Sequence, residues 1–276
     1  MHINGNIQLD YDDFCDTDVV YVREAKDGDK NISRRYLMAK IFAVSDIHGF
    51  FTEMKKALDN TGFDPQNPQH LLVSCGDAMD RGNQPREVIE FLNGLPNKVL
   101  ITGNHEILME DAIRRKYFLA HDYHNGTANT AYDFCKKENA GLMSHSQILG
   151  ELRDDPEYQK YMNLLVNYFE TDKYIFCHSW IPGGKDWRYA SQSKWNKAMW
   201  GNPFDIAAVV GNKTGKTIVH GHWHNSTGWW QKGIGSELDE DACFDIIEHD
   251  GCIGLDACTA LTHKVNVLVV EDNMIR

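Results

Sequence analysis

Acidic, imidazole and amide side chains recur in this chain directly after short apolar segments. The segments are residues 39–45, 71–75, 98–102, 173–177 and 216–219, each with the length and composition of a β-strand. The polar residues that follow them are, in chain order, Asp46, His48, Asp77, Asp80, Arg81, Asn104, His105, His178 and His222. In open α/β sheets, ligands bind outside the carboxyl ends of the strands. We therefore expect these side chains to meet at one edge of a sheet.

Carboxylate, imidazole and amide groups together are ligands for divalent transition metals, with Mn, Fe and Zn as candidates. The set contains enough ligands for two ions, and one carboxylate could bridge them. The sequence therefore predicts a metal centre at the sheet edge.

The first three strand-like segments are each followed by a helical pattern or by helix punctuation. Phe51, Met54 and Leu58 recur at helical spacing after the first segment. The next helix is expected to begin near Pro85 and end near Gly94. Successive strand–loop–helix units indicate a parallel sheet with crossover helices, and so an α/β fold.

Further elements are expected in the rest of the chain. Residues 106–170 are predicted to be mostly helical, with a loop at 121–129. Segments 243–247 and 252–255 flank a predicted hairpin turn, and 264–270 is the last predicted strand.

Length and composition favour a single globular domain. The 276 residues are 42% hydrophobic and 25% charged, and they contain no internal repeat, low-complexity tract or obvious linker. Residues 1–37 are polar and predict an N-terminal extension with a strand at 18–23. The domain is expected to span residues 38–276.

Charge and hydropathy limit the partners that we expect. A net charge of −12 argues against nonspecific binding to nucleic acid or to an anionic membrane. The apolar stretch at 267–270 is far too short to cross a bilayer, and the first ten residues lack the pattern of a signal peptide. The sequence therefore predicts a cytoplasmic protein without a nucleic-acid or membrane partner.

Cysteine usage agrees with a reducing compartment. The seven cysteines are odd in number and contain no Cys-x-x-Cys pair. Cys243, Cys252 and Cys258 lie near His249 and His263 in the sequence, but their spacing matches no compact zinc-ligand pattern. The sequence alone therefore favours free thiols over a zinc site there.

Three short motifs are more specific than the strand pattern. They are Asp46-x-His48-Gly49, Gly76-Asp77-x-x-Asp80-Arg81-Gly82 and Gly103-Asn104-His105-Glu106. Together they resemble the three signatures of the phosphoprotein phosphatase family, a branch of the calcineurin-like metallophosphoesterases with bacterial and bacteriophage lambda members. His178 and Gly221-His222 resemble the family's remaining ligands, so the resemblance covers residues 38–270.

The resemblance implies a fold and a ligand set. The fold would be a sandwich of two mixed β-sheets flanked by helices, with the metals at one edge. The cofactors would be two divalent ions, with manganese expected and iron or zinc as alternatives. Asp46 and His48 would bind the first ion, Asp77 would bridge both, and the remaining ligands of the second ion would be Asn104, His178 and His222.

The same resemblance implies a reaction. A hydroxide bridging the two metals would attack phosphorus, so no Ser or Cys nucleophile is needed. His105 would act as the general acid that protonates the leaving alkoxide, and Asp80 would orient its imidazolium. Arg81 would bind the phosphate through bidentate hydrogen bonds.

Some positions depart from the family pattern. Thr102 stands where many relatives have an arginine, so another cation would have to replace it; the candidates are Lys185, Arg188 and Lys194. His224 resembles the second histidine of the wider metallophosphoesterase pattern and is a candidate ligand of the first metal. Asn125-Gly126-Thr127 resembles a loop of some bacterial members, but it also has the composition of an ordinary turn and is left out of the predicted site.

The expected activity is that of a metal-dependent phosphatase acting on phosphorylated protein at Ser or Thr, or else at Tyr. The alternative is symmetrical hydrolysis of diadenosine tetraphosphate or action on another small phosphorylated substrate. Enzymes of that class share these motifs, a Gly221-His222-Trp223-like element and a Leu255-Asp256-like turn. A non-catalytic scaffold would be expected to lose ligands, whereas this chain keeps all six and His105.

Overall fold

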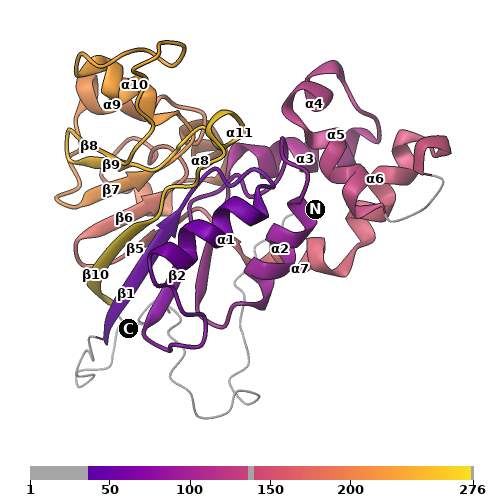
Figure 1. Ribbon diagram of the computed structural model, residues 1–276, viewed down its shortest axis with the longest axis horizontal. Helices are drawn as coiled ribbons and strands as arrows, with labels where there is room; N and C mark the ends of the chain where they lie inside the picture. Colours follow the sequence, from indigo (N-terminus) through magenta and orange to yellow (C-terminus); the bar gives the residue numbers. More distant parts are fainter. Residues whose placement is uncertain (1–36, 136–139, 275–276) are drawn as a thin grey trace.

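The protein is described from a computed structural model that places residues 37–135 and 140–274 (Figure 1). Its first sheet contains five strands in the order β10-β1-β2-β3-β4. Their bounds are β1 Leu37–Val44, β2 His70–Ser74, β3 Lys98–Ile101, β4 Leu165–Val166 and β10 Leu268–Met274. Strands β1 to β4 are parallel to their neighbours, and β10 pairs antiparallel with β1. The predicted parallel sheet is therefore present, with one antiparallel edge strand.

The second sheet also contains five strands, in the order β5-β6-β7-β9-β8. Their bounds are β5 Tyr168–Glu170, β6 Tyr174–Cys177, β7 Thr217–His220, β8 Ile247–His249 and β9 Cys252–Gly254. Strands β6, β7 and β9 are parallel, while β5 and β8 pair antiparallel at the two edges. Both sheets are therefore mixed, as the resemblance implies.

The alternation of side chains along β1 shows how the layers pack. Ile41 and Ala43 lie in a buried cluster with Phe176 and Val219 of the second sheet, so the two sheets face each other. Phe42 of the same strand lies in the larger cluster that the helices cover. Because successive side chains of a strand point to opposite faces, one strand contributes to both cores.

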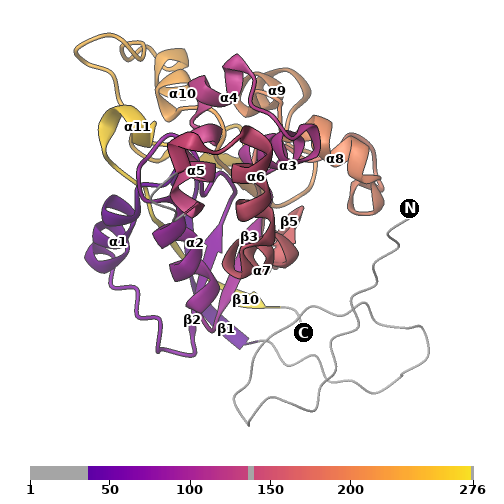
Figure 2. The ribbon, with the colours of Figure 1, turned by 90° about the vertical axis from the view of Figure 1, so that its right-hand side faces the viewer.

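Helices cover the outer faces of the sandwich. Those over the first sheet are α1 Phe51–Asn60, α2 Pro85–Gly94, α3 Asn104–Arg115, α5 Thr127–Phe134, α6 His145–Asp154 and α7 Pro156–Leu164 (Figure 2). Helix α4 Ala120–Asn125 packs against α5, and a 3₁₀ turn spans Ala140–Leu142. The helices after β6 are a 3₁₀ turn at Trp187–Tyr189, α8 Gln192–Ala198, α9 Pro203–Val210, α10 Asn225–Gln231 and α11 Thr259–Thr262. Trp195 of α8 and Ala207 of α9 pack against Ile175 and Ile218 of the second sheet. This arrangement is the predicted sandwich of two sheets flanked by helices.

Several predicted elements are confirmed with small changes in their bounds. Helix α2 begins and ends at the predicted Pro85 and Gly94. The hairpin is present, but β8 spans Ile247–His249, so only Ile247 of the predicted strand 243–247 belongs to it and the turn is shorter than predicted. The last strand begins at Leu268, later than the predicted 264. The strand expected at 18–23 lies outside the described residues.

Two predictions were wrong. The segment 121–129 is not a loop but the end of α4 and the start of α5, joined at Gly126 with a left-handed φ of 86°. Residues 165–170 form the short strands β4 and β5 rather than a helix, because pairing with β3 and β6 decides their conformation. Among the described residues, no helix has the length and apolar character needed to span a membrane.

Candidate active site

The polar residues after the strands gather where the parallel strands of both sheets end. Six of them have left-handed φ values between 50° and 73°: Asp46, His48, Asp77, Asp80, Arg81 and His222. Such a conformation costs about 1–3 kcal/mol at a non-glycine residue and persists only where the surroundings enforce it. Strain concentrated in this way is characteristic of functional sites.

Asp77 lies at the centre of the site, between two groups of histidines. Its Oδ2 lies 3.7 Å from His48 Nε2 and 3.9 Å from His105 Nε2. Its Oδ1 lies 3.5 Å from His178 Nε2. One potential ligand atom of each of Asp77, His178 and His222 lies within 4.8 Å of the others, and the same holds for His48, Asp77 and His105. The two oxygens of one carboxylate therefore face two potential ion positions.

The tautomers of two histidines favour metal binding. His48 Nδ1 lies 3.0 Å from the Met79 carbonyl oxygen, and His178 Nδ1 lies 2.8 Å from that of Cys75. A carbonyl oxygen only accepts, so each Nδ1 carries the proton and each Nε2 presents a lone pair toward Asp77. Metal-ligating histidines are typically oriented in this way.

The contact between Asn104 and His178 is the clearest sign that a metal ion fits this site. Asn104 Oδ1 lies 2.7 Å from His178 Nε2, so two acceptor atoms face each other when the imidazole is neutral. A cation bound by both atoms would satisfy this arrangement. His222 lies partly buried beside them, and desolvation followed by the neighbouring His178 lowers its pKa to about 2, which keeps the imidazole neutral as a ligand must be.

Asp46 is held by both sheets. Its Oδ2 accepts hydrogen bonds from the backbone N–H of His222 at 2.9 Å and from Ser45 Oγ at 2.5 Å. Thr259 Oγ1 donates to its backbone carbonyl at 2.9 Å. Asp46 thus lies beside the expected ligand His222 and links β1 to the end of β7, although it is in neither of the two groups that share Asp77.

His105 and Asp80 form a buried pair beside Asp77. His105 Nδ1 lies 2.8 Å from Asp80 Oδ2. Burial lowers the pKa of His105, but the carboxylates of Asp77 and Asp80 outweigh it and raise the pKa above its usual value. The imidazole is therefore suited to carry a proton that it can donate.

Sequence reasoning missed the residues that hold Asp80. Thr127 Oγ1 donates to Asp80 Oδ2 at 2.7 Å, and Thr130 Oγ1 donates to Oδ1 at 2.8 Å. Both threonines lie on α5; Thr127 falls in the segment that the prediction treated as a turn or loop, and Thr130 follows directly after that segment. The resemblance of Asn125-Gly126-Thr127 to a loop of bacterial relatives could have led us to predict Thr127 as a site residue.

Glu106 is a second positioning residue that the sequence analysis gave no role. It is fully buried, and its carboxylate accepts hydrogen bonds from the backbone N–H groups of Asp77, Ala78 and Gly103 at 2.7–3.1 Å. Tyr161 Oη donates to the same carboxylate at 3.0 Å. Glu106 thereby fixes the loop after β2 against the first turn of α3.

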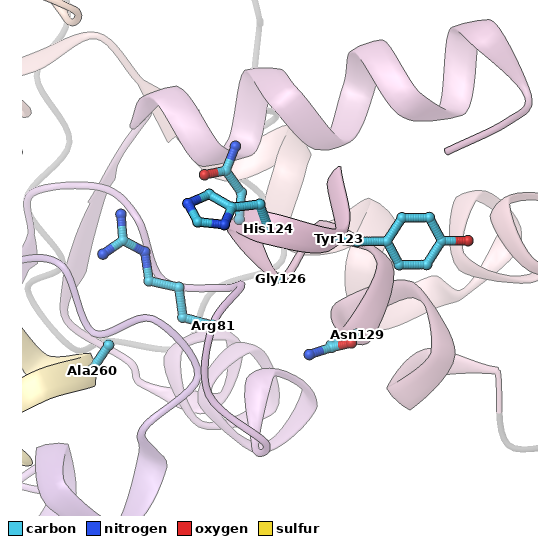
Figure 3. A pocket seen from close by; sticks show the side chains of 7 residues that line it. Arg81, Tyr123, His124, Gly126, Asn129 and Ala260 are labelled. Atoms are coloured by element: carbon cyan, nitrogen blue, oxygen red, sulfur yellow. The ribbon is translucent and has the colours of Figure 1, made fainter. Parts of the chain in front are cut away.

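Arg81, the residue after Asp80, lines an open pocket of about 340 Å³ (Figure 3). Its side chain extends along one wall beside Ala260, while His124 and Asn129 lie opposite and the ring of Tyr123 points away. No carboxylate is among the residues that line the pocket. The arrangement leaves the guanidinium available to an anionic ligand.

Two other candidates from the sequence lie in different surroundings. Arg188, a suggested replacement for the missing arginine, forms an ion pair with Glu170. His224 Nδ1 lies 2.6 Å from Glu237 Oε2, and His224 forms a group with Glu237 and Cys258 rather than with the ligands around Asp77. Its role as a ligand of the first metal stays a prediction.

Known proteins resemble this chain over most of its length. The model of the calcineurin-like phosphoesterase family matches residues 39–226. Serine/threonine-protein phosphatase 2 of Salmonella typhimurium is 24% identical over 190 residues, which are 67% of this chain and 80% of that protein. The symmetrical bis(5'-nucleosyl)-tetraphosphatase of Aeromonas hydrophila is 38% identical over 71 residues, which span only 25% of either chain.

A solved structure supports the same architecture. A cold-active protein tyrosine phosphatase superposes with a TM-score of 0.51 at 15% identity, covering 84% of this chain and 73% of that chain. At this identity, the similarity shows a shared fold.

Proposed function

Because the chain belongs to the calcineurin-like phosphoesterase family, whose members hydrolyse phosphoester bonds at a divalent metal centre, we propose that it is a protein phosphatase acting on phosphoserine and phosphothreonine. Phosphotyrosine is the less favoured side chain. The long alignment with the Salmonella serine/threonine-protein phosphatase supports this substrate class. Free thiols at all cysteines within the described residues support a cytoplasmic location.

We assign the metal ligands from the geometry around Asp77. Asp46 and His48 would hold one ion, and Asp77 would bridge to the other. The remaining ligands of the second ion would be Asn104, His178 and His222. Oxygen and nitrogen donors in this mixture suit manganese, with iron or zinc as alternatives.

The chain's own residues would act on the phosphate as follows. Two divalent ions, when bound, supply an activated water and polarise the phosphoryl oxygens. Arg81 binds the phosphate from the side of the open pocket. His105 donates its Nε2 proton to the leaving oxygen, and Asp80 holds the imidazole at Nδ1 and stabilises its protonated form.

The observation that carries this proposal is the sharing of Asp77 between two imidazole groups, with the His105–Asp80 pair beside it. The alternative substrate, diadenosine tetraphosphate, is suggested by the short match to tetraphosphatases and would use the same centre. The shared motifs do not separate the two substrates.

The deciding experiment compares kcat/KM of the manganese-loaded protein for a phosphoserine peptide and for diadenosine tetraphosphate. A preference of at least tenfold for the peptide is expected. A comparable preference for the dinucleotide would reject the protein-phosphatase proposal and support the alternative. Activity on neither compound, with turnover of a simple aryl phosphate, would reject both substrates while leaving the metal-centre assignment in place.

A further inference from the structure

His224, Glu237 and Cys258 form a third group of potential metal ligands that shares no residue with the two groups around Asp77. One ligand atom of each residue lies within 4.8 Å of the other two. We propose that this group is a separate zinc site, independent of the two-metal centre.

The chemistry of the three donors favours zinc. An imidazole nitrogen, a carboxylate oxygen and a thiolate sulfur are all common zinc ligands, and sulfur excludes the harder ions Mg²⁺ and Ca²⁺. Thiolate and carboxylate together carry two negative charges, which neutralise one Zn²⁺ when the imidazole is neutral. The site would therefore be electrically balanced in its partly buried position.

The distances are compatible with a single ion. Zinc bonds of about 2.0–2.3 Å place the ligand atoms of a tetrahedral shell roughly 3.3–3.8 Å apart. His224 Nδ1 and Glu237 Oε2, now 2.6 Å apart, would have to separate by only about 1 Å, and a ligand atom of each of the three residues, Cys258 Sγ included, already lies within 4.8 Å of the others. The Glu237 side chain is 39% exposed, so it has room to make this movement.

Three separate segments bring these donors together. His224 is the residue before α10, Glu237 lies in the loop after that helix, and Cys258 precedes α11. Cys258 has a left-handed φ of 52° although it is not glycine, and it is only 6% exposed. A metal bound here would join the loop and both helices, which gives a reason for holding a cysteine in a strained conformation.

The site lies next to the two-metal centre without belonging to it. His222 contributes to the group around Asp77, whereas His224, two residues later, faces Glu237. Three protein ligands leave a fourth position for water, as in zinc sites that are not closed. The proposal therefore assigns to His224 a role different from the one predicted from its motif.

The test is a titration of the metal-free full-length protein with Co²⁺, which replaces zinc and reports on its ligands. A cysteine thiolate bound to Co²⁺ produces a charge-transfer band in the near ultraviolet, and none of the proposed ligands around Asp77 is a thiol. We expect three bound equivalents and a thiolate band in the wild-type protein, and two equivalents without the band in Cys258→Ser. Cys243→Ser, which changes a half-buried cysteine outside the group, should behave like wild type.

Two further variants separate this proposal from the proposed function. Asp77→Asn should lose the ions of the two-metal centre and keep the thiolate band. Glu237→Gln, at a half-exposed position, should weaken binding of the third ion at least tenfold even if Cys258→Ser does not fold. A wild-type protein without the band, a band that survives Cys258→Ser, or unchanged affinity in Glu237→Gln would overturn the zinc site, whatever the phosphatase activity.

Discussion

The Nδ1 atom of His105 lies 2.8 Å from Oδ2 of Asp80. This contact fixes the ring and leaves Nε2 directed toward the side of Asp77 where the phosphate would bind. The pair joins α3 to the loop after β2, and α5 holds the carboxylate from the other side. The position of the proposed acid thus depends on elements that are distant in the sequence.

Replacement of His105 by Asn should slow turnover most for substrates with poor leaving groups. General-acid catalysis contributes about 10²–10⁴-fold, and an aryl leaving group such as nitrophenolate needs little of it. We expect kcat for a phosphoserine peptide to fall by at least about 100-fold, and kcat for nitrophenyl phosphate to fall much less. The two values are measured on the same manganese-loaded preparation.

The matched control is His263→Asn, which changes a largely exposed histidine at the end of α11. Asn tolerates its left-handed φ, so activity should remain unchanged. An equal loss of kcat on both substrates in His105→Asn would argue against proton donation by this residue.

Asp80→Asn should move the alkaline limb of the pH–rate profile to lower pH. In the proposed mechanism the protonated imidazole of His105 is the active form, so activity should be lost as pH rises through the pKa of His105. The carboxylates of Asp77 and Asp80 raise that pKa against the effect of burial. Removing one of them lowers the pKa, and a change of about 1 unit or more is expected from the loss of a contacting charge.

The profile of kcat for the phosphoserine peptide, recorded between pH 5 and 10, checks this shift. Thr127→Val removes only the hydroxyl that hydrogen-bonds Asp80 and should give a smaller shift in the same direction or none. An alkaline limb that stays in place in Asp80→Asn would show that another group controls it.

Asp77→Asn should abolish the two-metal centre as a unit. Both oxygens of this carboxylate face histidine nitrogens, and an amide offers only one neutral oxygen. We expect kcat to fall by more than about 100-fold and bound manganese to fall from two equivalents to less than one. Metal analysis after gel filtration measures the content, and Asp59→Asn on the surface of α1 is the control.

Chelation tests the same dependence without a substitution. Activity should disappear after treatment with a chelator and return when Mn²⁺ is added. Activity that resists complete removal of metal would contradict the assignment of the ligands around Asp77.

Glu106→Gln should destabilise the protein and weaken metal binding together. The carboxylate accepts four hydrogen bonds, three of them from backbone N–H groups of Asp77, Ala78 and Gly103. A glutamine places N–H donors against N–H donors, and a buried unsatisfied group costs about 1–3 kcal/mol. Loss of such a positioning contact lowers metal affinity by about 10–100-fold.

Urea unfolding and manganese titration measure these two effects. Glu110→Gln lies one turn later on the same helix at an exposed position, and it should change neither quantity. A Glu106→Gln protein with wild-type metal affinity would limit the role of Glu106 to stability.

The gathering of the proposed ligands around Asp77 could be predicted because each follows a strand, so chain position alone places them at the sheet edge; their role in binding metal stays a prediction. The sequence could not show how Asp80 is held. Thr130 lies 50 residues after it in the chain, and only the packing of α5 brings the two together. The same limit applies to Glu106 and Tyr161, and to the grouping of His224 with Glu237 and Cys258. The parallel order of β1 to β3 followed from the repeated strand–helix pattern, whereas β4 and β5 are too short to have a pattern of their own.

Gly126→Ala should disturb phosphate binding through Arg81. A Cβ at Gly126 would lie 2.1 Å from the backbone nitrogen of Arg81, so the loop that presents the guanidinium must shift. Gly62 has a similar left-handed φ of 77°, but a Cβ there would meet no atom within 4 Å. Gly62→Ala therefore carries only the conformational cost, about 1 kcal/mol, while Gly126→Ala adds about 1–3 kcal/mol of steric strain.

The measurements are KM for the phosphopeptide and the inhibition constant of inorganic phosphate in both variants. Gly126→Ala should raise both constants several-fold, since the proposed mechanism has Arg81 bind the phosphate before and during the reaction, whereas Gly62→Ala should leave them at wild-type values. Bound manganese should remain at two equivalents in each variant, because the ligands around Asp77 do not contact Gly126. Equal constants in the two variants would show that the junction of α4 and α5 stabilises the fold without positioning Arg81.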